Sequence, residues 1–282
     1  MEVDRKTLGG AALVLASALS IQLGAALATT TFDTISPISA TGLSYAFAAL
    51  ILLVVQPPRR IAAWDRQKWL DALALGVSAA CASSFFYLSI DRLPLGSAVT
   101  IEFLGPLGLA IVSGRRRGVF VAAGLALVGV ALVSGASPDG DAAGVGFALI
   151  AGLGWALYMV ASRRAGRHGY PGEGLTIALC VTTLVCLPFS AAAVPRLGAT
   201  SILGALVLVG VFGRAMPFRL EMAALGRLRP ATAGVLFSVE PAIAAIVGAV
   251  ALGQGMTAAQ VLGILAVVLA GVLVLREVPA AD

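Results

Sequence analysis

Ten long apolar runs constrain this chain more than any other feature of its sequence. Each run is close to the roughly 20 mostly apolar residues that a helix needs to cross a bilayer. They cover roughly 8–28, 36–55, 69–90, 94–113, 118–136, 143–162, 174–194, 201–221, 230–252 and 257–275. Because a transmembrane strand needs only about 9–11 residues of alternating polarity, runs of this length favour helices. The sequence therefore predicts an all-α membrane protein with ten transmembrane helices.

Little of the chain lies outside these runs. The connections within the 282 residues are short, so we expect no sizeable extramembrane domain. The first run follows Arg5 and Lys6 and contains Ala26-Leu27-Ala28, which resembles the layout of a cleaved signal peptide. We expect a retained first helix instead, because the run is long for a signal peptide and nine more runs follow.

Lysine and arginine alternate between the connections in a way that predicts orientation. One set of alternate segments carries 15 of these residues, and the other set carries only Arg92 and Arg196, beside several aspartates. Since positive residues are retained on the cytoplasmic side, we expect both termini there. The net charge of +5 follows from this bias. The arginines lie in short loops at the membrane surface, so no nucleic-acid partner is predicted.

The second half of the sequence repeats landmarks of the first. Arg92-Leu93 recurs as Arg227-Leu228 and Pro106 recurs as Pro241, each 135 residues later. Chance similarity between apolar helices is the alternative, but two landmarks at one offset favour a repeat. Five spans in each copy would place the copies in opposite orientations, as in many secondary transporters with a substrate site near the midplane. The predicted five-helix repeats cover 1–140 and 141–282.

Among the charged residues inside the apolar runs are Glu102, Arg214, Arg219, Glu221 and Glu240. A charge in hydrocarbon is costly, so charges in spans commonly face a bundle interior or a water-filled path and mark a function. Arg219 lies near the predicted cytoplasmic end of its run, where its long side chain more readily reaches the interface. The other four predict a path for a polar solute.

Glu102 and Glu240 lie about midway along the fourth and ninth runs, which are partners in the predicted repeat. A carboxyl group buried without a fixed cation is able to exchange protons near neutral pH. Each is therefore a candidate proton site or a partner for a substrate ammonium group. The alternative is a protonated acid that is hydrogen-bonded to a free backbone carbonyl. We favour a functional role because an acid in an apolar span is costly to keep.

Arg214, Phe218 and Glu221 share one face of the eighth run, at positions i, i+4 and i+7. Arg214 is a candidate for holding a substrate carboxylate, because a guanidinium binds carboxylates through two parallel hydrogen bonds. A structural ion pair with Glu221, or with an acid on another helix, explains this arginine equally well. Glu221 is a third candidate for a proton or ammonium site.

Three prolines lie within the predicted spans: Pro106, Pro217 and Pro241. Each lacks a backbone N–H and so frees a carbonyl four residues earlier, which lipid cannot satisfy. For Pro217 a packing kink and a site are equally good explanations. For Pro106 and Pro241 a nearby glutamate favours a site. The freed carbonyls would be those of Glu102, Gly213 and Phe237.

Further polar and aromatic side chains are candidates for lining a site. They are Gln22, Tyr45, Ser84, Tyr87, Trp155 and Tyr158. Trp155 and Tyr158 are neighbours at i and i+3 and could line a pocket for an amphipathic solute. Aromatic residues also populate membrane interfaces routinely, which explains each of them singly at least as well.

The sequence contains no pattern that predicts a metal site, a cofactor or catalysis. His168, the only histidine, lies in an arginine-rich loop, so it cannot form a zinc site with other histidines. Cys81, Cys180 and Cys186 lie in apolar runs without the spacing of metal ligands, and we expect them reduced. No nucleophile and base are spaced for catalysis. A transporter is favoured over an enzyme, and a receptor-like protein is weakened by the lack of extramembrane mass.

Several short segments carry a resemblance to a known family. They are Ser20-Ile21-Gln22, Tyr87-Leu88-Ser89-Ile90, Glu102-Phe103-Leu104-Gly105-Pro106, Trp155-Ala156-Leu157-Tyr158, Leu220-Glu221-Met222 after Pro217-Phe218, and Glu240-Pro241-Ala242. On these segments the chain, from about residue 8 to 275, resembles the EamA branch of the drug/metabolite transporter superfamily. Within that branch it is similar to the bacterial inner-membrane exporters of threonine and homoserine.

The resemblance implies a ten-helix carrier in the bacterial inner membrane, built from two inverted repeats. It implies export of threonine, homoserine or analogues by proton exchange, with no cofactor and an unspecified oligomeric state. The chain departs from the family at Gly253-Gln254, where a Gly-Glu pair is common, and little is expected to follow in a loop. Arg214 and Arg219 also look atypical, and they favour the alternative of an EamA-type carrier for another metabolite or drug, such as an anionic solute.

Overall fold

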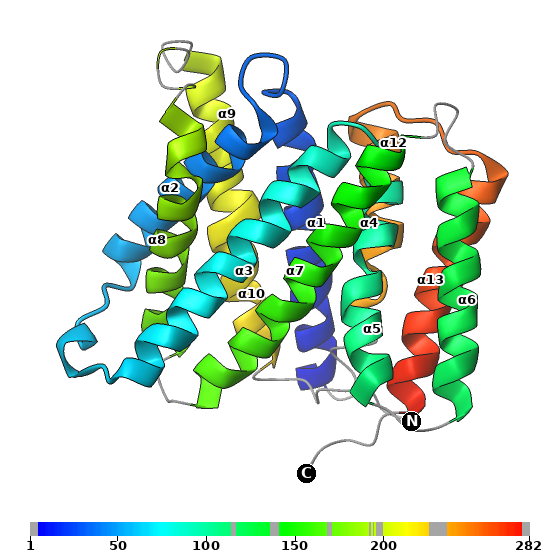
Figure 1. The fold of residues 1–282 in the computed structure, drawn as a ribbon, viewed down its shortest axis with the longest axis horizontal. Helices are drawn as coiled ribbons and strands as arrows, with labels where there is room; N and C mark the ends of the chain where they lie inside the picture. The colour runs from blue at the N-terminus through cyan, green and yellow to red at the C-terminus, as the bar shows by residue number, and fades with distance from the viewer. Residues whose placement is uncertain are drawn as a thin grey trace.

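Helices make up nearly all of the part of the chain that the computed structural model describes (Figure 1). The described residues are 5–113, 117–135, 141–167, 171–191, 193, 195, 200–225 and 236–277, and they contain no strand. Two short elements differ from α-helices: η1 is a 3-10 helix and η3 is a π-helix. The bounds are α1 (Arg5–Thr29), α2 (Pro37–Val55), η1 (Ile61–Ala63), α3 (Arg66–Ile90), α4 (Leu95–Glu102), α5 (Leu104–Ser113), α6 (Arg117–Gly135), α7 (Ala142–Arg167), α8 (Pro171–Ser190), α9 (Thr200–Gly210), η3 (Val211–Ala215), α10 (Met216–Leu225), α12 (Glu240–Ala251) and α13 (Ala258–Glu277).

Within the described residues, six helices are long and apolar enough to cross a membrane. They are Leu8–Thr29, Pro37–Val55, Arg66–Ile90, Ala142–Ala165, Gly172–Ser190 and Ser201–Glu221. Four shorter apolar helices fall on the other predicted runs, at Leu95–Leu109, Phe120–Val133, Glu240–Ala251 and Ala258–Leu273. The prediction of an all-helical membrane protein is confirmed at this level.

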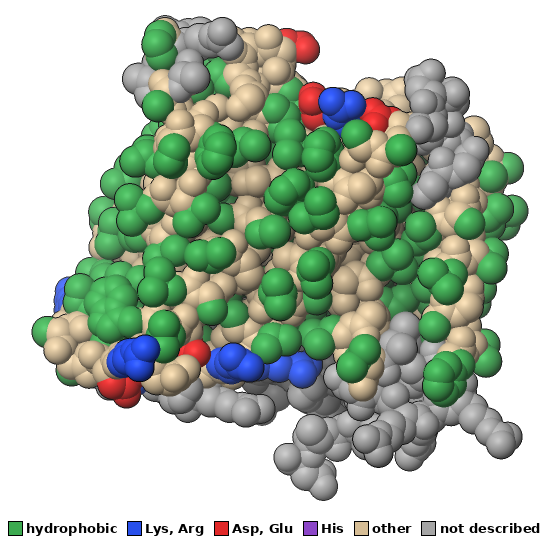
Figure 2. All heavy atoms as spheres, in the orientation of Figure 1, with side chains coloured by type: hydrophobic (Ala, Val, Ile, Leu, Met, Phe, Trp, Pro, Cys, Tyr) green, Lys and Arg blue, Asp and Glu red, His purple; other side chains and the backbone are tan. Residues whose placement is uncertain are grey.

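The outer surface suits a lipid environment. Hydrophobic side chains cover the broad middle of the face in Figure 2, and Lys and Arg gather along its lower edge. Val54, Val112 and Val250 are each more than 80% exposed, which is favourable only against an apolar solvent. α1 begins and α13 ends at that same lower edge (Figure 1), as the charge pattern predicts for two termini on one side. Arg196, Arg227, Arg229 and His168 lie outside the described residues.

An ion pair joins the end of α3 to the start of α7. Arg92 Nη1 lies 3.1 Å from Asp141 Oδ2, and the backbone N–H of Gly144 donates to Asp141 Oδ1 at 2.9 Å. The Gly144 amide first, and then Arg92, hold the pKa of the Asp141 carboxyl below its ordinary value. The predicted placement of Arg92 and Asp141 on the same side of the membrane agrees with this contact.

Most helix contacts join the first half of the sequence to the second. α3 packs against α7 and α8, α2 against α8, α6 against α13, α4 against α12, and α1 against α10 and α12. Lipid tails are as apolar as these helices, so association depends on close packing between small residues. Gly129 of α6 and Gly263 of α13 provide such a contact, as do Gly24 of α1 and Gly213 of η3.

Each of the three prolines lies in the first turn of an α-helical segment, after an interruption of the regular α-helical pattern. Pro106 is in the first turn of α5, behind the break at Phe103, and Pro241 is in the first turn of α12, behind a turn at 238–239. Pro217 is the second residue of α10 and follows the π-helix η3. The apolar helices run on through Pro106 and Pro217, as Leu95–Leu109 and Ser201–Glu221, whereas Pro241 stands at the start of α12, where its missing N–H has no cost.

The contact between α6 and α13 makes a stability prediction. A Cβ atom on Gly129 would lie 2.7 Å from the carbonyl oxygen of Gly263 and 2.8 Å from Val267 Cγ2. Because a backbone carbonyl cannot give way, Gly129→Ala should lower the free energy of unfolding by about 1–3 kcal/mol. Gly124→Ala, in the same helix with nothing within 4 Å, is the matched control and should be neutral or slightly stabilising. Thermal unfolding of the purified variants in detergent measures both, and equal melting temperatures would contradict the packing described.

Candidate functional site

The guanidinium group of Arg214 lies in the interior of the bundle, where side chains of two other helices contact it. The Cζ of Arg214, in η3, lies 4.6 Å from the ring centroid of Tyr45 in α2 and 4.9 Å from that of Tyr87 in α3. Its Nη1 donates a hydrogen bond to Ser83 Oγ at 3.2 Å. The hydroxyls of Tyr45 and Ser83 share a further hydrogen bond of 2.8 Å. Arg214 is thus fixed by two aromatic faces and one hydroxyl.

The π-helix η3 explains why Arg214 points toward α2 and α3. A π-turn inserts an extra residue into a helix and changes the direction of the side chains that precede it; such turns occur frequently at functional sites. Gly24 of α1 allows the backbone of η3 to approach closely at Gly213, and Ser20 Oγ donates to the carbonyl of Phe212. These contacts hold η3 against α1.

Two donors of Arg214 have no hydrogen-bond partner within the described part of the chain. They are Nε and Nη2, and both atoms are buried. Among the described residues, Arg92–Asp141 is the only ion pair, so Arg214 and Glu221 do not form the pair that their spacing allowed. A buried donor without an acceptor costs about 1–3 kcal/mol, and more when it is charged. The free edge of Arg214 is therefore suited to an anionic ligand.

Two of the predicted acids lie at the helix breaks. Glu102 is the last residue of α4 and Glu240 is the first residue of α12, and they are 9% and 4% exposed. A carboxylate at the start of α12 is favoured by the helix dipole. Gly152 of α7 leaves room for the Glu102 carbonyl, because a Cβ there would lie 2.5 Å from that oxygen. Both acids were predicted to lie midway along a span, and in the structure each lies where the α-helix is interrupted.

The acids and Arg214 share one region of the interior. Glu102 and Arg214 lie within electrostatic range of each other, and Glu240 lies within range of both Glu102 and Glu221. Glu221 accepts a hydrogen bond from Ser17 Oγ at 2.9 Å. The structure therefore brings together Glu102, Arg214, Glu221 and Glu240, the four charged residues that predict a polar path. Arg219 is exposed, as expected for a side chain that reaches the interface.

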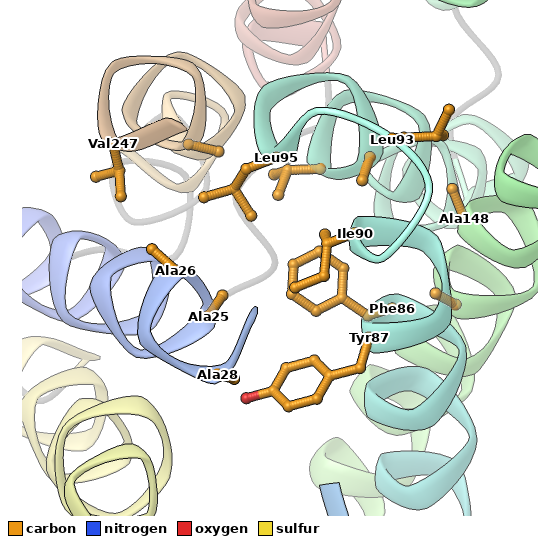
Figure 3. Packing of buried hydrophobic residues seen from close by; sticks show 14 of the residues in the cluster. Ala25, Ala26, Ala28, Phe86, Tyr87, Ile90, Leu93, Leu95, Ala148 and Val247 are labelled. Atoms are coloured by element: carbon orange, nitrogen blue, oxygen red, sulfur yellow. The ribbon is translucent and has the colours of Figure 1, made fainter. Parts of the chain in front are cut away.

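The aromatic candidates have different surroundings. Tyr87 is 1% exposed, and Figure 3 shows its ring pointing from α3 toward α1 beside Ala28, with Phe86 and Ile90 packed next to it. Tyr158 lies within electrostatic range of Glu221, which places it near the acids. Trp155 stacks edge-on against Phe103, with ring centroids 6.2 Å apart. Trp155 is therefore the neighbour of the α4–α5 break.

Two polar candidates differ in how their groups are satisfied. Gln22 is 2% exposed, and its Oε1 is buried without a hydrogen-bond partner among the described residues. Ser84 lies 3.6 Å from Cys186 Sγ of α8, so its hydroxyl serves the contact between α3 and α8. Gln22 stays a candidate for a ligand contact, and Ser84 is accounted for by packing.

Ser17 and Ser83 are site residues that sequence reasoning missed. Serine is common in helices that pack in membranes, so one serine in an apolar run carries no distinct signal. For Ser17 a signal exists: Ser17, Ser20 and Gly24 fall on one face of α1, and that face packs against η3 and α10. Nothing in the sequence singles out Ser83 from the serines around it.

Gln254 also has a role that sequence reasoning did not expect. Its Oε1 accepts a hydrogen bond from the backbone N–H of Leu95 at 2.9 Å. Leu95 is the first residue of α4, whose initial N–H groups have no partner within the helix. The loop between α12 and α13 therefore caps the helix that ends at Glu102.

Comparisons with known proteins agree on one family. The model of the EamA-like transporter family matches residues 142–276. The threonine/homoserine exporter RhtA of Salmonella typhimurium is 36% identical over 263 residues, which covers 92% of this chain and 88% of the relative. The exporter RhtA of Escherichia coli K12 is 36% identical over 262 residues.

A solved structure supports the fold. One crystal structure of a protein aligns with 93% of this chain and 96% of its own chain, with a TM-score of 0.62 and 18% sequence identity. At that identity the match concerns the fold alone. In the described part of the chain no group of three or more His, Cys, Asp or Glu residues is placed to hold a metal ion.

The contact between Ser17 and Glu221 predicts a loss of stability. Ser17→Ala removes the hydroxyl that lies 2.9 Å from Glu221 Oε1 and 3.1 Å from the carbonyl oxygen of Pro217. Because this leaves a polar group in the bundle without its partner, the free energy of unfolding should fall by about 1–3 kcal/mol. Ser44→Ala is the control, since its fully buried hydroxyl bonds only to the carbonyl of Thr41 in the same helix. Chemical unfolding in detergent compares the two, and an equal loss in both would argue against the contact.

Proposed function

Because this chain belongs to the EamA-like transporter family, we propose that it exports threonine, homoserine or similar small amino acids across the bacterial inner membrane in exchange for protons. The curated relatives that are 36% identical over most of the chain are named exporters of these two amino acids. The observation that carries the proposal is the buried edge of Arg214, with two donors free, beside buried acids.

Arg214 is the proposed site for the carboxylate of the solute. Nε and Nη2 lie on the same edge of the planar guanidinium, so their N–H bonds point in parallel toward the two oxygens of a carboxylate. The rings of Tyr87 and Tyr45 lie against the group, and Nε and Nη2 have no hydrogen-bond partner in the described part of the chain. A small amino acid always carries one such carboxylate.

Glu102, Glu240 and Glu221 are the proposed sites for protons or for the ammonium group of the solute. Three carboxyl groups in one interior with a single guanidinium cannot all be ionised without a large cost of desolvation. Protons therefore have to occupy some of them, and a solute that brings a carboxylate to Arg214 changes which ones. This competition would couple amino-acid movement to proton movement.

The inverted five-helix repeats, 1–140 and 141–282, are part of the proposal. The packing supports them when α4 with α5, and α9 with η3 and α10, are counted as one span each. The ten spans are then numbered in chain order, and each is exchanged with the span five places away. Under this exchange the contact of α3 with α7 becomes that of α10 with α1, and the contact of α3 with α8 becomes that of α9 with α2. Three contacts are unchanged by the exchange: α2 with α8, α4 with α12, and α6 with α13. Both termini would be cytoplasmic, as the charge pattern predicts.

A second candidate is a carrier of the same family for another carboxylate-bearing metabolite or drug. Arg214 favours it, because a free guanidinium edge recognises a carboxylate and not the rest of the solute. Arg219 is exposed and gives no second buried cation. A solute with one carboxylate therefore fits better than a dianion, which keeps small amino acids first.

Counterflow and gradient-driven uptake in proteoliposomes test the proposal. The wild type should exchange labelled threonine and homoserine, and an imposed pH gradient should drive net movement. Glu102→Gln keeps the size and hydrogen-bonding capacity of the side chain but removes its proton exchange. The gradient-driven component should therefore fall to the level of protein-free liposomes, while counterflow persists.

Asp33→Asn is the control for this experiment, because Asp33 is exposed in the turn after α1. It should retain both activities. If a folded Glu102→Gln protein kept full gradient-driven movement, Glu102 would not be the coupling residue. Loss of both activities in Glu102→Gln would assign this acid to binding of the solute.

A further inference from the structure

We propose that Ser83 and Tyr45 position Arg214 so that its Nε–Nη2 edge selects solutes with a free carboxylate. This inference rests on the proposed function, because it concerns the site through which the solute would pass. It adds two residues, Ser83 and the hydroxyl of Tyr45, that act on the solute only through the guanidinium.

The two ends of the guanidinium differ in their surroundings. Nη1 is bonded to Ser83 Oγ at 3.2 Å, whereas Nε and Nη2 are buried without a partner among the described residues. The side chain therefore has one edge bound to protein and one edge left for a ligand. No described acid forms an ion pair with Arg214, so Glu102 does not occupy that free edge.

Ser83 is itself oriented by a second side chain. Its Oγ lies 2.8 Å from the hydroxyl of Tyr45, and the ring of Tyr45 is also the closer of the two rings to the guanidinium. Tyr45 thus acts on Arg214 twice, through its ring directly and through its hydroxyl by way of Ser83. All three side chains come from different elements, α2, α3 and η3, so the network sets the position of one helix relative to the others.

The arrangement matters because an arginine side chain is long and has several rotatable bonds. Ordering such a side chain has an entropic cost, and a group that is ordered before the ligand arrives spares the ligand that cost. Without the Ser83 hydroxyl the guanidinium could rotate and present other N–H groups. Affinity for a carboxylate would fall, while solutes that make no paired contact with Arg214 would be little affected.

The first experiment compares Ser83→Ala with Ser83→Thr in threonine counterflow. Ser83→Ala should raise the KM for threonine by about tenfold with a nearly unchanged maximal rate, as expected for loss of one charge-assisted hydrogen bond that orients the binding group. Ser83→Thr retains the hydroxyl and should restore most of the affinity. Ser78→Ala is the matched control: Ser78 is on the same helix, is 7% exposed against 8% for Ser83, and bonds only to carbonyls of its own helix.

The second experiment measures competition by threonine and by threonine amide, which lacks the carboxylate. In the wild type threonine should compete at least about tenfold better than the amide, because only the carboxylate uses both free donors. The ratio should contract in Ser83→Ala. Tyr45→Phe keeps the ring and removes the hydroxyl, so adding it to Ser83→Ala should cause no further loss if the hydroxyl acts through Ser83.

The outcomes separate this inference from the proposed function. If Ser83→Ala has the same kinetics as Ser78→Ala and leaves the threonine-to-amide ratio unchanged, the positioning role is overturned. If the wild type exchanges lactate but neither threonine nor homoserine, and Ser83→Ala weakens lactate selectively, the amino-acid function is overturned and the carboxylate edge stands. Exchange of none of these carboxylates by folded wild-type protein overturns the inference.

Discussion

The buried positive charge of Arg214 is the interaction on which the interior of this protein depends. A guanidinium in an apolar bundle has to be satisfied by protein, water or ligand, and here protein satisfies only part of it. Two tyrosine rings and one serine hydroxyl hold it, and Glu102 lies within electrostatic range of it. The incomplete satisfaction is what makes the site suited to a carboxylate, because a fully paired arginine would have nothing to offer a solute.

Interruptions of the helices place the charged groups where they are. A continuous α-helix satisfies its own backbone and presents side chains at a fixed spacing. The π-helix η3 and the breaks before Pro106 and Pro241 remove that restriction. Each break lies beside small residues of another helix, such as Gly152 beside the carbonyl of Glu102. Glycine allows a neighbouring helix to pack closely against the break. The polar backbone groups at the break therefore face protein instead of lipid.

The contacts between the two halves explain how such a bundle could rearrange during transport. Most helix pairs join residues of the first half to residues of the second, so the site is formed between halves and not within one. Tyr45, Ser83 and Glu102 come from the first half, and Arg214, Glu221 and Glu240 from the second. Any relative movement of the halves would change the distances between the guanidinium, its supports and the acids. That dependence links the packing of the bundle to the chemistry of its interior.

The sequence by itself determined the class of the protein and the identity of its costly charges. Long apolar runs can bury their backbone polar groups only as helices, and Glu102, Arg214, Glu221 and Glu240 stand out because charge is rare in such runs. The same periodicity allowed a pair between Arg214 and Glu221 and predicted a continuous helix through Pro241, and both differ in the structure. Ser83 and Gln254 gave no distinct signal, since a serine or a loop glutamine gains its role only from what packs against it. Only the tertiary structure decided which donors of Arg214 are used and which are free, because that depends on distances between helices that are far apart in the chain.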